Sequence, residues 1–283
     1  MLRLRRFEPA DLGFALRQTD REGWAASRER FATHLEHDPD GCLIAEVGDR
    51  RVGMVSTTGF GTSGWIGNLI VDPKYRSRGV GRALMERGLE MLHRRGVRTV
   101  RLDADPPGIP LYRSLGFVDE FESRRFVRRP SALHPGPARG DVEAMTLKDL
   151  PSVCTLDRGV FGADRSRILH LFHRTCESAW VRRSERDRVD GFLMTSATDR
   201  GLWIGPSVAS SGVDAAALLA AALASASARP ALIGVPSPNT GAIRTLVDLG
   251  FTATPSSLRM RLGSNTDRGD PSRIVAIASG AVG

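Results

Sequence analysis

An internal repeat constrains the fold of this chain more than any other feature of its sequence. Three segment pairs recur at one offset of 138 residues: Phe7–Leu12 with Met145–Leu150, Gly53–Thr57 with Gly191–Thr195, and Trp65–Gly67 with Trp203–Gly205. A fourth pair, Leu115–Phe117 with Leu249–Phe251, is offset by 134 residues, so the second copy has four residues fewer in between. Because this period is too long for a solenoid unit and matches the size of a common domain, the repeat predicts two domains of one fold.

The two copies meet in a segment whose composition excludes regular structure. Arg128–Gly140 contains three prolines and two glycines, and these residues interrupt helices and strands. We therefore predict a first domain over residues 1–129, a linker over residues 130–140 and a second domain over residues 141–283.

The composition excludes several classes of protein. With 41% hydrophobic and 25% charged residues, the 283-residue chain is globular rather than disordered. Its first residues show no signal peptide, and its longest apolar run, Ala215–Ala224, covers ten residues, half of the ~20 that cross a bilayer. These features predict a cytoplasmic protein with no membrane partner.

The cysteines and histidines do not indicate a disulfide framework or a metal site. Cys42, Cys154 and Cys176 are an odd number of cysteines without a Cys-x-x-Cys spacing. Two His-x-x-His pairs, starting at His34 and His170, have no third ligand that the sequence can pair with them. We therefore predict that no metal is bound.

The hydrophobic pattern of the first copy predicts the order strand, helix, helix, three strands, helix, strand, helix, strand. The strands are expected over Leu2–Phe7, Cys42–Val47, Arg51–Thr58, Trp65–Val71 and Val97–Asp103, with a last one from Phe117. The helices are expected from Glu8, over Ser27–Leu35 with Ser27 as its cap, over Val80–Arg95 and over Ile109–Ser114. This order predicts an α/β domain in which helices flank a mixed sheet.

A basic loop with two glycines joins the strand that ends at Val71 to the helix that starts at Val80. The first turn of a helix leaves backbone N–H groups unpaired and carries about half a positive charge. Four basic side chains lie within nine residues here: Lys74, Arg76, Arg78 and Arg82. This combination suits a pyrophosphate better than a single carboxylate. The loop is neither a Walker loop nor a Gly-x-Gly-x-x-Gly loop, because it has no Gly-Lys-Ser/Thr and Leu84 occupies the third glycine position.

Two motifs of the first copy resemble those of a known family. Arg76-x-x-Gly79-x-Gly81 resembles the Arg/Gln-x-x-Gly-x-Gly/Ala signature of the GNAT acetyltransferases, and Leu111–Phe117 resembles their Leu-Tyr-x-x-Leu-Gly-Phe. The resemblance covers residues 2–128, and the predicted element order is the one that the family uses. It departs at Asp105–Gly108, where members often carry Asn and then Ala. The family's side-chain contacts to the pantetheine arm are therefore not carried over to this segment.

The resemblance implies an acyltransferase that moves an acetyl group from acetyl-CoA, its co-substrate, directly to a primary amine. The backbone amides of Arg78, Gly79, Val80, Gly81 and Arg82 would hold the pyrophosphate, next to Arg76. Leu69, Ile70 and Val71 would pair with the pantetheine arm as an added strand, and an amide there would polarise the thioester carbonyl.

The resemblance also implies a catalytic residue, Tyr112, which is placed where the family keeps a tyrosine that protonates the departing thiolate. A phenol with a pKa near 10 gives its proton to a thiolate whose acid has a pKa near 8.5 only at a cost of about 2 kcal/mol. Tyr112 is therefore expected to stabilise the thiolate chiefly by hydrogen bonding unless the site shifts one pKa. No general base is assigned, although Glu46, Asp103 and Asp105 lie at or near strand ends.

The second copy keeps the scaffold and loses the phosphate loop. Residues 201–228 contain no Lys or Arg, only Gly212 remains of the glycine pair, and Leu246 stands at the position of Tyr112. The strand from Trp203 and the Ala-rich helix, capped by Asp214 and ending near Ala228, are expected to be joined by a connection about three residues shorter than in the first copy. We predict a degenerate GNAT-like domain that shapes the acceptor site or the interface between the domains.

Two residues of the second copy favour CoA binding by that copy, and its C-terminal tail is expected to pack. Asn239 and Ala242 fit the family pattern where the first copy does not, so a CoA function of the second domain stays open. The C-terminal tail, with Ile274–Ala278, is apolar enough to pack against the domain.

The distribution of positive charge supports the assignment of CoA binding to the first domain. The chain carries a net charge of +8 and has 38 Arg but two Lys, a bias that genome composition would also produce. Residues 1–140 hold 24 basic and 18 acidic residues (+6), and residues 141–283 hold 16 and 14 (+2). The asymmetry marks the first domain as the one that binds acetyl-CoA.

The same features also bear on alternatives of function and partner. A non-catalytic acetyl-CoA-binding regulatory module is the alternative to an enzyme, because no general base stands out. Nucleic-acid binding is disfavoured, because CoA already accounts for the basic cluster. The acceptor, a small-molecule or a peptide or protein amine, is not determined by the sequence, since variable loops such as Asp20–His37 form its pocket. A homodimer is compatible with the sequence.

Overall fold

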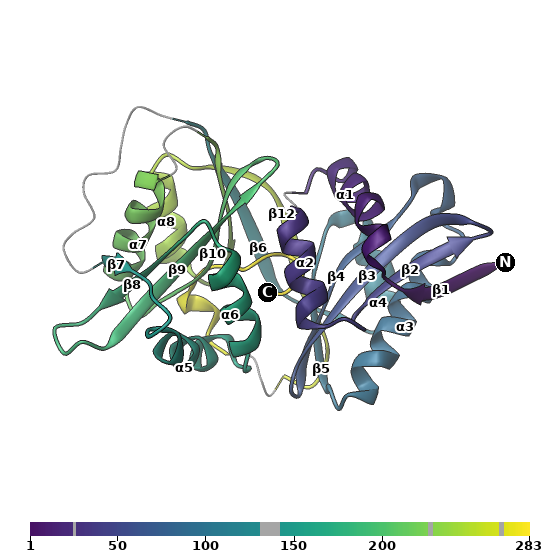
Figure 1. The fold of residues 1–283 in the computed structure, drawn as a ribbon, viewed down its shortest axis with the longest axis horizontal. Helices are drawn as coiled ribbons and strands as arrows, with labels where there is room; N and C mark the ends of the chain where they lie inside the picture. The colour runs from purple at the N-terminus through teal and green to yellow at the C-terminus, as the bar shows by residue number, and fades with distance from the viewer. Residues whose placement is uncertain (25–26, 131–141, 226–228, 266–268) are drawn as a thin grey trace. The chain divides into compact units, whose positions relative to one another are not determined.

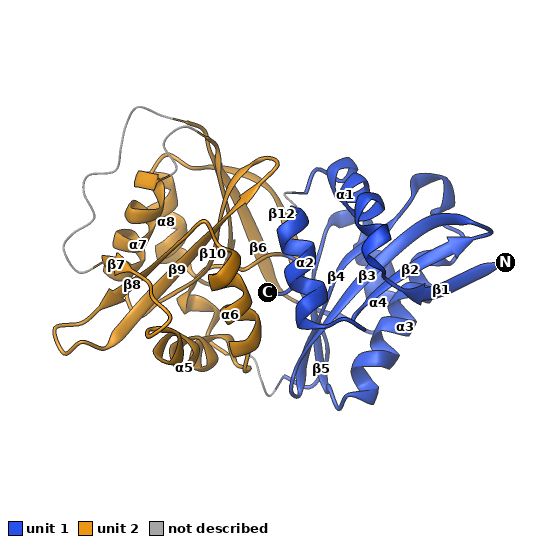
Figure 2. Cartoon of the chain, in the orientation of Figure 1, with its two compact units in different colours: residues 1–119, 260–266, 280–283 blue, residues 120–259, 267–279 orange. Residues whose placement is uncertain are grey.

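The computed structural model describes residues 1–24, 27–130, 142–225, 229–265 and 269–283. The predicted linker therefore lies, apart from Pro130, outside the described residues. The chain forms two compact units, which Figure 2 colours separately. Unit 1 comprises Met1–Asp119, Met260–Thr266 and Gly280–Gly283, and unit 2 comprises Glu120–Arg259 and Asp267–Ser279.

Unit 1 has the predicted order of elements and a mixed sheet (Figure 1). Its strands are β1 (Leu2–Arg6), β2 (Cys42–Val47), β3 (Arg50–Phe60), β4 (Ser63–Val71) and β5 (Thr99–Ala104). Its helices are α1 (Leu12–Arg21), α2 (Arg28–His37), α3 (Val80–Arg94) and α4 (Ile109–Ser114). Strands β1 to β4 pair antiparallel in sequence order, and β5 runs parallel to β4. The predicted α/β class is confirmed.

Helices cover both faces of this sheet. On one face, Phe14 and Ala15 of α1 pack with Met54 and Ile70 in one buried cluster. On the other face, α3 approaches so closely that a Cβ atom on Gly53 would lie 3.2 Å from Leu84. Since neighbouring residues of a strand point to opposite faces, Gly53 and Met54 place α3 and α1 on opposite sides of β3.

Unit 2 repeats this architecture. Its strands are β7 (Val142–Ala144), β8 (Ser178–Arg183), β9 (Val189–Thr198), β10 (Gly201–Ala209) and β11 (Ala231–Pro236). Its helices are α5 (Leu150–Phe161), α6 (Ser166–Thr175), α7 (Gly212–Ser225) and α8 (Thr240–Asp248). The predicted cap of α7 was wrong, because Ser211 occupies that role: its Oγ accepts a hydrogen bond from the Asp214 amide at 3.2 Å. The end of this helix that the sequence placed near Ala228 falls partly outside the described residues.

The compact units do not coincide with the two sequence copies, because each unit includes the end of the other copy. Strand β6 (Val118–Arg128) closes the first copy, yet from Glu120 it belongs to unit 2 and pairs antiparallel with β11, Ser123 opposite Pro236. Strand β12 (Thr252–Gly263) closes the second copy, yet from Met260 it belongs to unit 1.

The C-terminal residues complete the packing of unit 1. Thr99 donates a hydrogen bond to the Ser264 carbonyl at 2.9 Å, and the indole of Trp65 donates one to the Gly280 carbonyl at 3.0 Å. A Cβ atom on Gly67 would lie 2.3 Å from the backbone of Ala281, so only glycine allows this approach. The tail of unit 2 packs as predicted, since Ile274–Ala278 are at most 7% exposed and β13 (Ile274–Ala276) pairs with β10.

None of the helices in the described parts of the chain combines the length and the hydropathy that a membrane span requires.

Candidate functional site

Strands β4 and β5 of unit 1 diverge after a short stretch of pairing. The described ladder joins Ser63 to Thr99, Gly64 to Val100 and Trp65 to Arg101, while the other edge of β4 stays paired with β3 as far as Val71. Beyond Gly67, against which the backbone of Ala281 packs, β4 therefore presents backbone groups toward the space between the two strands. An extended ligand can bind such an edge as an added strand. The predicted residues Leu69, Ile70 and Val71 lie on this part of β4.

A β-bulge interrupts β4 just before these residues. Ser56 of β3 lies opposite Gly67 and Met54 lies opposite Ile70, so two residues of β4, Asn68 and Leu69, face one residue of β3. Asn68 has a φ of 51°, and its side-chain amide donates a hydrogen bond to Ser56 Oγ at 3.0 Å. A bulge reorients the backbone locally. Sequence reasoning missed it, and the one available signal was an Asn within an apolar strand, since Asn tolerates positive φ better than most residues.

The basic loop after β4 has an ordered geometry. A short 3₁₀ turn, Pro73–Tyr75, is capped by Asp72, whose carboxylate accepts a hydrogen bond from the Lys74 amide at 3.0 Å. Ser77 and Gly79 then adopt positive φ values of 59° and 80° and turn the chain into α3. No atom lies within 4 Å of a Cβ built on Gly79, so its backbone conformation rather than space favours glycine at this position.

The first turn of α3 has backbone donors without helical acceptors. Gly79 is the N-cap of α3 and provides no side-chain cap, and the first intrahelical bond runs from the Ala83 amide to the Gly79 carbonyl at 3.0 Å. The amides of Val80, Gly81 and Arg82 therefore have no acceptor within the helix. Together with the helix dipole they form an anion-binding position.

The basic side chains of the loop point to different partners. Arg76 donates from Nε to the Val71 carbonyl at 2.9 Å and forms an ion pair with Glu22, so it braces the loop against the end of β4. The Arg78 guanidinium lies 5.7 Å from the centre of the Tyr75 ring. Arg82 donates a hydrogen bond to Ser114 Oγ at 2.7 Å. Arg78 and Arg82 are both exposed and flank the free amides of α3.

Tyr112 is buried on α4, 8% exposed, with its ring 6.1 Å from that of Phe117. Burial, together with the negative charge of Asp105, raises the pKa of Tyr112 above its ordinary value. The Asp105 carboxylate accepts a hydrogen bond from the Trp24 indole at 2.9 Å. A Cβ atom on Gly108 would lie 2.7 Å from the Tyr112 ring, so glycine lets this ring occupy its place.

The structure does not single out a general base among the carboxylates that the sequence suggested. Glu46 forms an ion pair with Arg5 at 2.8 Å, which ties its charge to the fold. Asp105 is engaged by Trp24, as described above, and Asp103 is half-buried at the end of β5. The residues that the structure describes contain no cluster of three His, Cys, Asp or Glu side chains suited to a metal ion.

Unit 2 lacks the loop. Ser210 and Ser211 alone connect β10 to α7, whereas eight residues, 72–79, connect β4 to α3. The predicted shortening by about three residues was therefore too small, since the difference is six. Ser211 caps α7, so the first turn already has an internal acceptor. Leu246, at the position of Tyr112, is fully buried in the core of unit 2.

Comparison with known proteins gives one consistent family. Residues 11–117 match the acetyltransferase (GNAT) family model, and residues 153–276 match a second acetyltransferase (GNAT) domain model. The solved structure of a putative acetyltransferase from Pyrococcus horikoshii is similar over 100% of this chain and 96% of its own, with a TM-score of 0.85 and 30% identity.

Two further proteins extend the comparison. An uncharacterized N-acetyltransferase of Bacillus subtilis is 28% identical over 193 residues, which are 68% of this chain and 67% of that protein. A tandem GNAT protein from the clavulanic acid biosynthesis pathway shares the fold over 93% of this chain and 98% of its own, with a TM-score of 0.65 at 15% identity.

Proposed function

This chain belongs to the GNAT acetyltransferase family, a family of acyltransferase enzymes, and from that premise we propose that unit 1 transfers an acetyl group from acetyl-CoA to a primary amine. The observation that carries the proposal is that two binding features follow one another along one segment of the chain. The open edge of β4 ends at Val71, and the uncapped first turn of α3 begins at Val80. An extended arm with a diphosphate at its end fits these two features in that order.

In this proposal the chain binds CoA mainly through backbone groups. The amides of Val80, Gly81 and Arg82 hold the pyrophosphate, with Arg78 and Arg82 as nearby positive charges. Arg76 acts as a brace that fixes the loop rather than as a phosphate ligand, because its guanidinium already binds Val71 and Glu22. The edge of β4 from Leu69 to Val71 pairs with the pantetheine arm.

The reaction is a direct displacement at the thioester. The amine nitrogen forms a bond to the carbonyl carbon, the carbon–sulfur bond breaks, and the CoA sulfur leaves with the electron pair. The nitrogen releases one proton to solvent water. An amide next to the bulge at Asn68 polarises the carbonyl, and one such donor contributes about 3–4 kcal/mol in the transition state.

Tyr112 stabilises the departing thiolate by a hydrogen bond from its phenol. Full proton transfer to the thiolate costs about 2 kcal/mol at unperturbed pKa values. Burial raises the pKa of Tyr112 further, so the phenol is a weaker acid than in water and keeps its proton. Unit 2, which lacks both the loop and the tyrosine, binds no CoA through α7.

Two measurements on the full-length chain test the proposal. Acetyl-CoA binding is measured by calorimetry, and turnover is measured as the release of free CoA thiol over a panel of amines. We expect both binding and turnover. Absence of acetyl-CoA binding would contradict the proposal as a whole. Binding without turnover on any amine would favour the alternative, a regulatory module that senses acetyl-CoA.

A matched pair of variants locates the binding site. Exchanging Arg78 and Arg82 for Gln is expected to weaken acetyl-CoA binding at least tenfold, since both charges flank the free amides. Exchanging Arg87 and Arg94 for Gln makes the same change in net charge on the exposed surface of α3, where both arginines pair with Glu90, and is expected to leave binding unchanged. Equal losses in both variants would show that overall charge, and not this loop, attracts CoA.

A further inference from the structure

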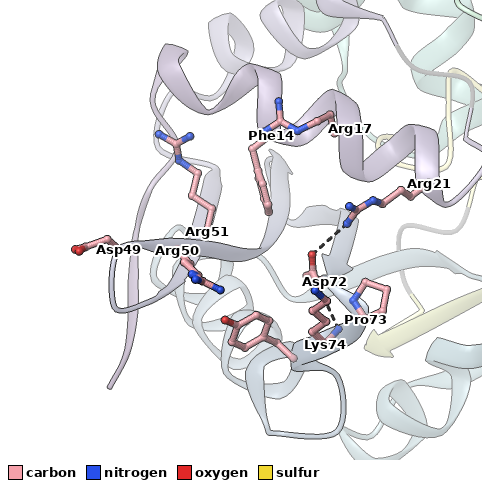
Figure 3. Close-up of a pocket in the computed structure, with 10 residues that line it drawn as sticks. Phe14, Arg17, Arg21, Asp49, Arg50, Arg51, Asp72, Pro73 and Lys74 are labelled. Atoms are coloured by element: carbon pink, nitrogen blue, oxygen red, sulfur yellow. Dashed lines mark hydrogen bonds and ion pairs between the residues drawn. The ribbon is translucent and has the colours of Figure 1, made fainter.

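A second basic site in unit 1 adjoins the loop before α3, because the first residues of that loop, Asp72–Tyr75, form one of its walls. Figure 3 shows a cleft of about 650 Å³ between α1, the turn from β2 to β3 and the residues that follow β4. Five of its lining residues are basic and two are acidic; the lining comprises Phe14, Arg17, Arg21, Asp49, Arg50, Arg51, Asp72, Pro73, Lys74 and Tyr75. Charges of one sign gathered in a concave site raise the local concentration of counter-ions.

The fold neutralises two of these five cations and leaves three. Arg21 pairs with Asp72 at 3.1 Å, and Arg51 pairs with Asp11 at 2.7 Å. For Arg17, Arg50 and Lys74, the described residues provide no acidic side chain within ion-pair distance. By contrast, Arg87 and Arg94 on α3 both pair with Glu90. Against Asp49, the one lining carboxylate that makes no ion pair in the described structure, the three cations of the cleft leave an excess of two positive charges, which suits a multiply charged anion.

The cleft lies on the face of the sheet opposite to the helix that receives the pyrophosphate. Phe14, which lines the cleft, packs from α1 onto the face of Met54 and Ile70. The helix α3 packs onto the opposite face, through Leu84 against Gly53. The α1 wall of the cleft therefore lies on the opposite face of the sheet from α3.

We propose that this cleft binds a phosphate or carboxylate group of the amine acceptor, so that the enzyme prefers acceptors that carry an anionic group at a distance from the reacting amine. The inference rests on the proposed function. Asp72 and Pro73 line the cleft and directly follow Val71 of the open β4 edge. At about 3.3 Å per extended residue, the four steps from Leu69 to Pro73 separate the two positions by roughly 13 Å. An acidic or phosphorylated peptide spans this distance with about four residues.

The test uses the full-length chain and two variants of equal charge. Arg17→Gln with Arg50→Gln removes two cations that make no ion pair in the described structure, so folding is expected to be unaffected. Arg87→Gln with Arg94→Gln is the control. Initial rates are measured on lysine peptides with Glu, phosphoserine or Gln four residues from the lysine, and on short alkylamines with and without a phosphate. These two acceptor sets distinguish a peptide from a small molecule as the source of the anion.

We expect the wild-type chain and the control to prefer the anionic member of at least one set about tenfold in kcat/KM, and the Arg17/Arg50 variant to lose this preference while its rate on neutral acceptors is unchanged. Identical preferences in all three proteins would overturn the proposal. It would also be overturned if the Arg17/Arg50 variant bound CoA more weakly but dephospho-CoA equally well, because the 3′-phosphate of the donor would then occupy the cleft.

A separate titration keeps the two proposals distinguishable. Inorganic pyrophosphate is titrated into the chain saturated with CoA, or into the free chain if CoA does not bind. Binding that falls at least tenfold in the Arg17/Arg50 variant and not in the control supports the cleft as an anion site, even if no CoA binds and the proposed function fails. Binding that is equal in the variant and the control overturns the anion site.

Discussion

Tyr112 combines two properties that define what it can contribute. It lies at the position that the family resemblance indicates, and its burial beside Asp105 raises the pKa of its phenol. Its identity could be predicted from Leu111–Phe117. Its electrostatic surroundings could not, because they depend on Trp24 holding Asp105 across more than 80 positions of the sequence.

Replacing Tyr112 with Phe removes the hydroxyl and keeps the ring. We expect kcat to fall about 10- to 100-fold, because a hydrogen bond to a charged group contributes about 1.5–3 kcal/mol, and the dissociation constant of acetyl-CoA to stay within twofold. Steady-state rates and calorimetry on the same preparation measure both. Phe117→Leu, which alters the packing of the ring but keeps the hydroxyl, is the control. An unchanged kcat in Tyr112→Phe would remove this residue from the mechanism.

His34 makes the stability of unit 1 depend on pH. It is buried on α2 with Nε2 2.9 Å from Thr58 Oγ1, and burial lowers its pKa from 6.5 to about 4. Between these values the unfolded chain binds a proton that the folded chain does not, so stability falls as the pH falls through 6.5 and levels off near pH 4. The loss amounts to roughly 3 kcal/mol for this depression.

Urea unfolding at pH 7 and pH 4 measures this contribution. The wild-type chain is expected to lose roughly 3 kcal/mol more between these pH values than His34→Gln, whose amide can still hydrogen-bond to Thr58 but does not titrate. Both proteins share the same carboxylates, so the contribution of these groups is removed when the changes in unfolding free energy between the two pH values are compared. Equal changes in the unfolding free energy of the two proteins would show that His34 has the same pKa in the folded and the unfolded chain.

At the scale of elements, local sequence signals specified the site's scaffold well. The helix α3 and the strand β4 were predicted from their periodicity, and the loop between them from Gly79, Gly81 and its arginines. The sequence did not indicate the bulge at Asn68, because a bulge is a mismatch between two strands and cannot be seen in one of them. The length of the connection in unit 2 was missed for a similar reason, since the start of α7 depends on Ser211 as its cap.

The two glycines of the loop, Gly79 and Gly81, are expected to differ in their response to substitution by alanine. Gly79 has a φ of 80°, where an L-residue costs about 1–2 kcal/mol, so Gly79→Ala is expected to distort the first turn of α3 and weaken acetyl-CoA binding about tenfold. Gly81 lies inside the helix, and a Cβ atom there is 3.5 Å from Leu111, an ordinary contact. Gly81→Ala is therefore expected to bind acetyl-CoA as the wild-type chain does. Calorimetry on the two variants decides, and equal affinities would contradict the role assigned to Gly79.

At the scale of the whole molecule, the sequence revealed the duplication but not how the copies share their strands. The repeat was visible because Trp65–Gly67 and Trp203–Gly205 are local. The sequence did not show that each unit includes the end of the other copy, because strand pairing between residues more than 100 positions apart leaves no periodic signal in either strand. The side-chain hydrogen bonds of Thr99 to Ser264 and of Trp65 to Gly280 join residues that are similarly far apart in the sequence.

Because unit 1 includes the end of the second copy, we predict that the first copy does not fold alone. A chain of residues 1–140 lacks Met260–Gly263 and Gly280–Gly283, so β5 loses a neighbour and the Trp65 indole loses its acceptor, which costs about 1–3 kcal/mol by itself. We expect this fragment to be insoluble or to lack a cooperative thermal transition. Co-expression of 1–140 with 141–283 as two chains is expected to restore a soluble complex that binds acetyl-CoA. A fragment that unfolds alone at the Tm of the full chain would contradict the shared architecture.

The place of Gly280–Gly283 in unit 1 also sets the order of events during synthesis. The residues from Met1 to Asp119 leave the ribosome before Glu120–Arg259 of unit 2, yet the unit to which they belong also includes Gly280–Gly283. At about 5–20 residues per second, the remaining 164 residues take roughly 8–33 s to translate. The open edge of β5 and the surface around Gly67 are exposed throughout that interval. The unit that carries the proposed chemistry is thus begun before unit 2 and completed after it.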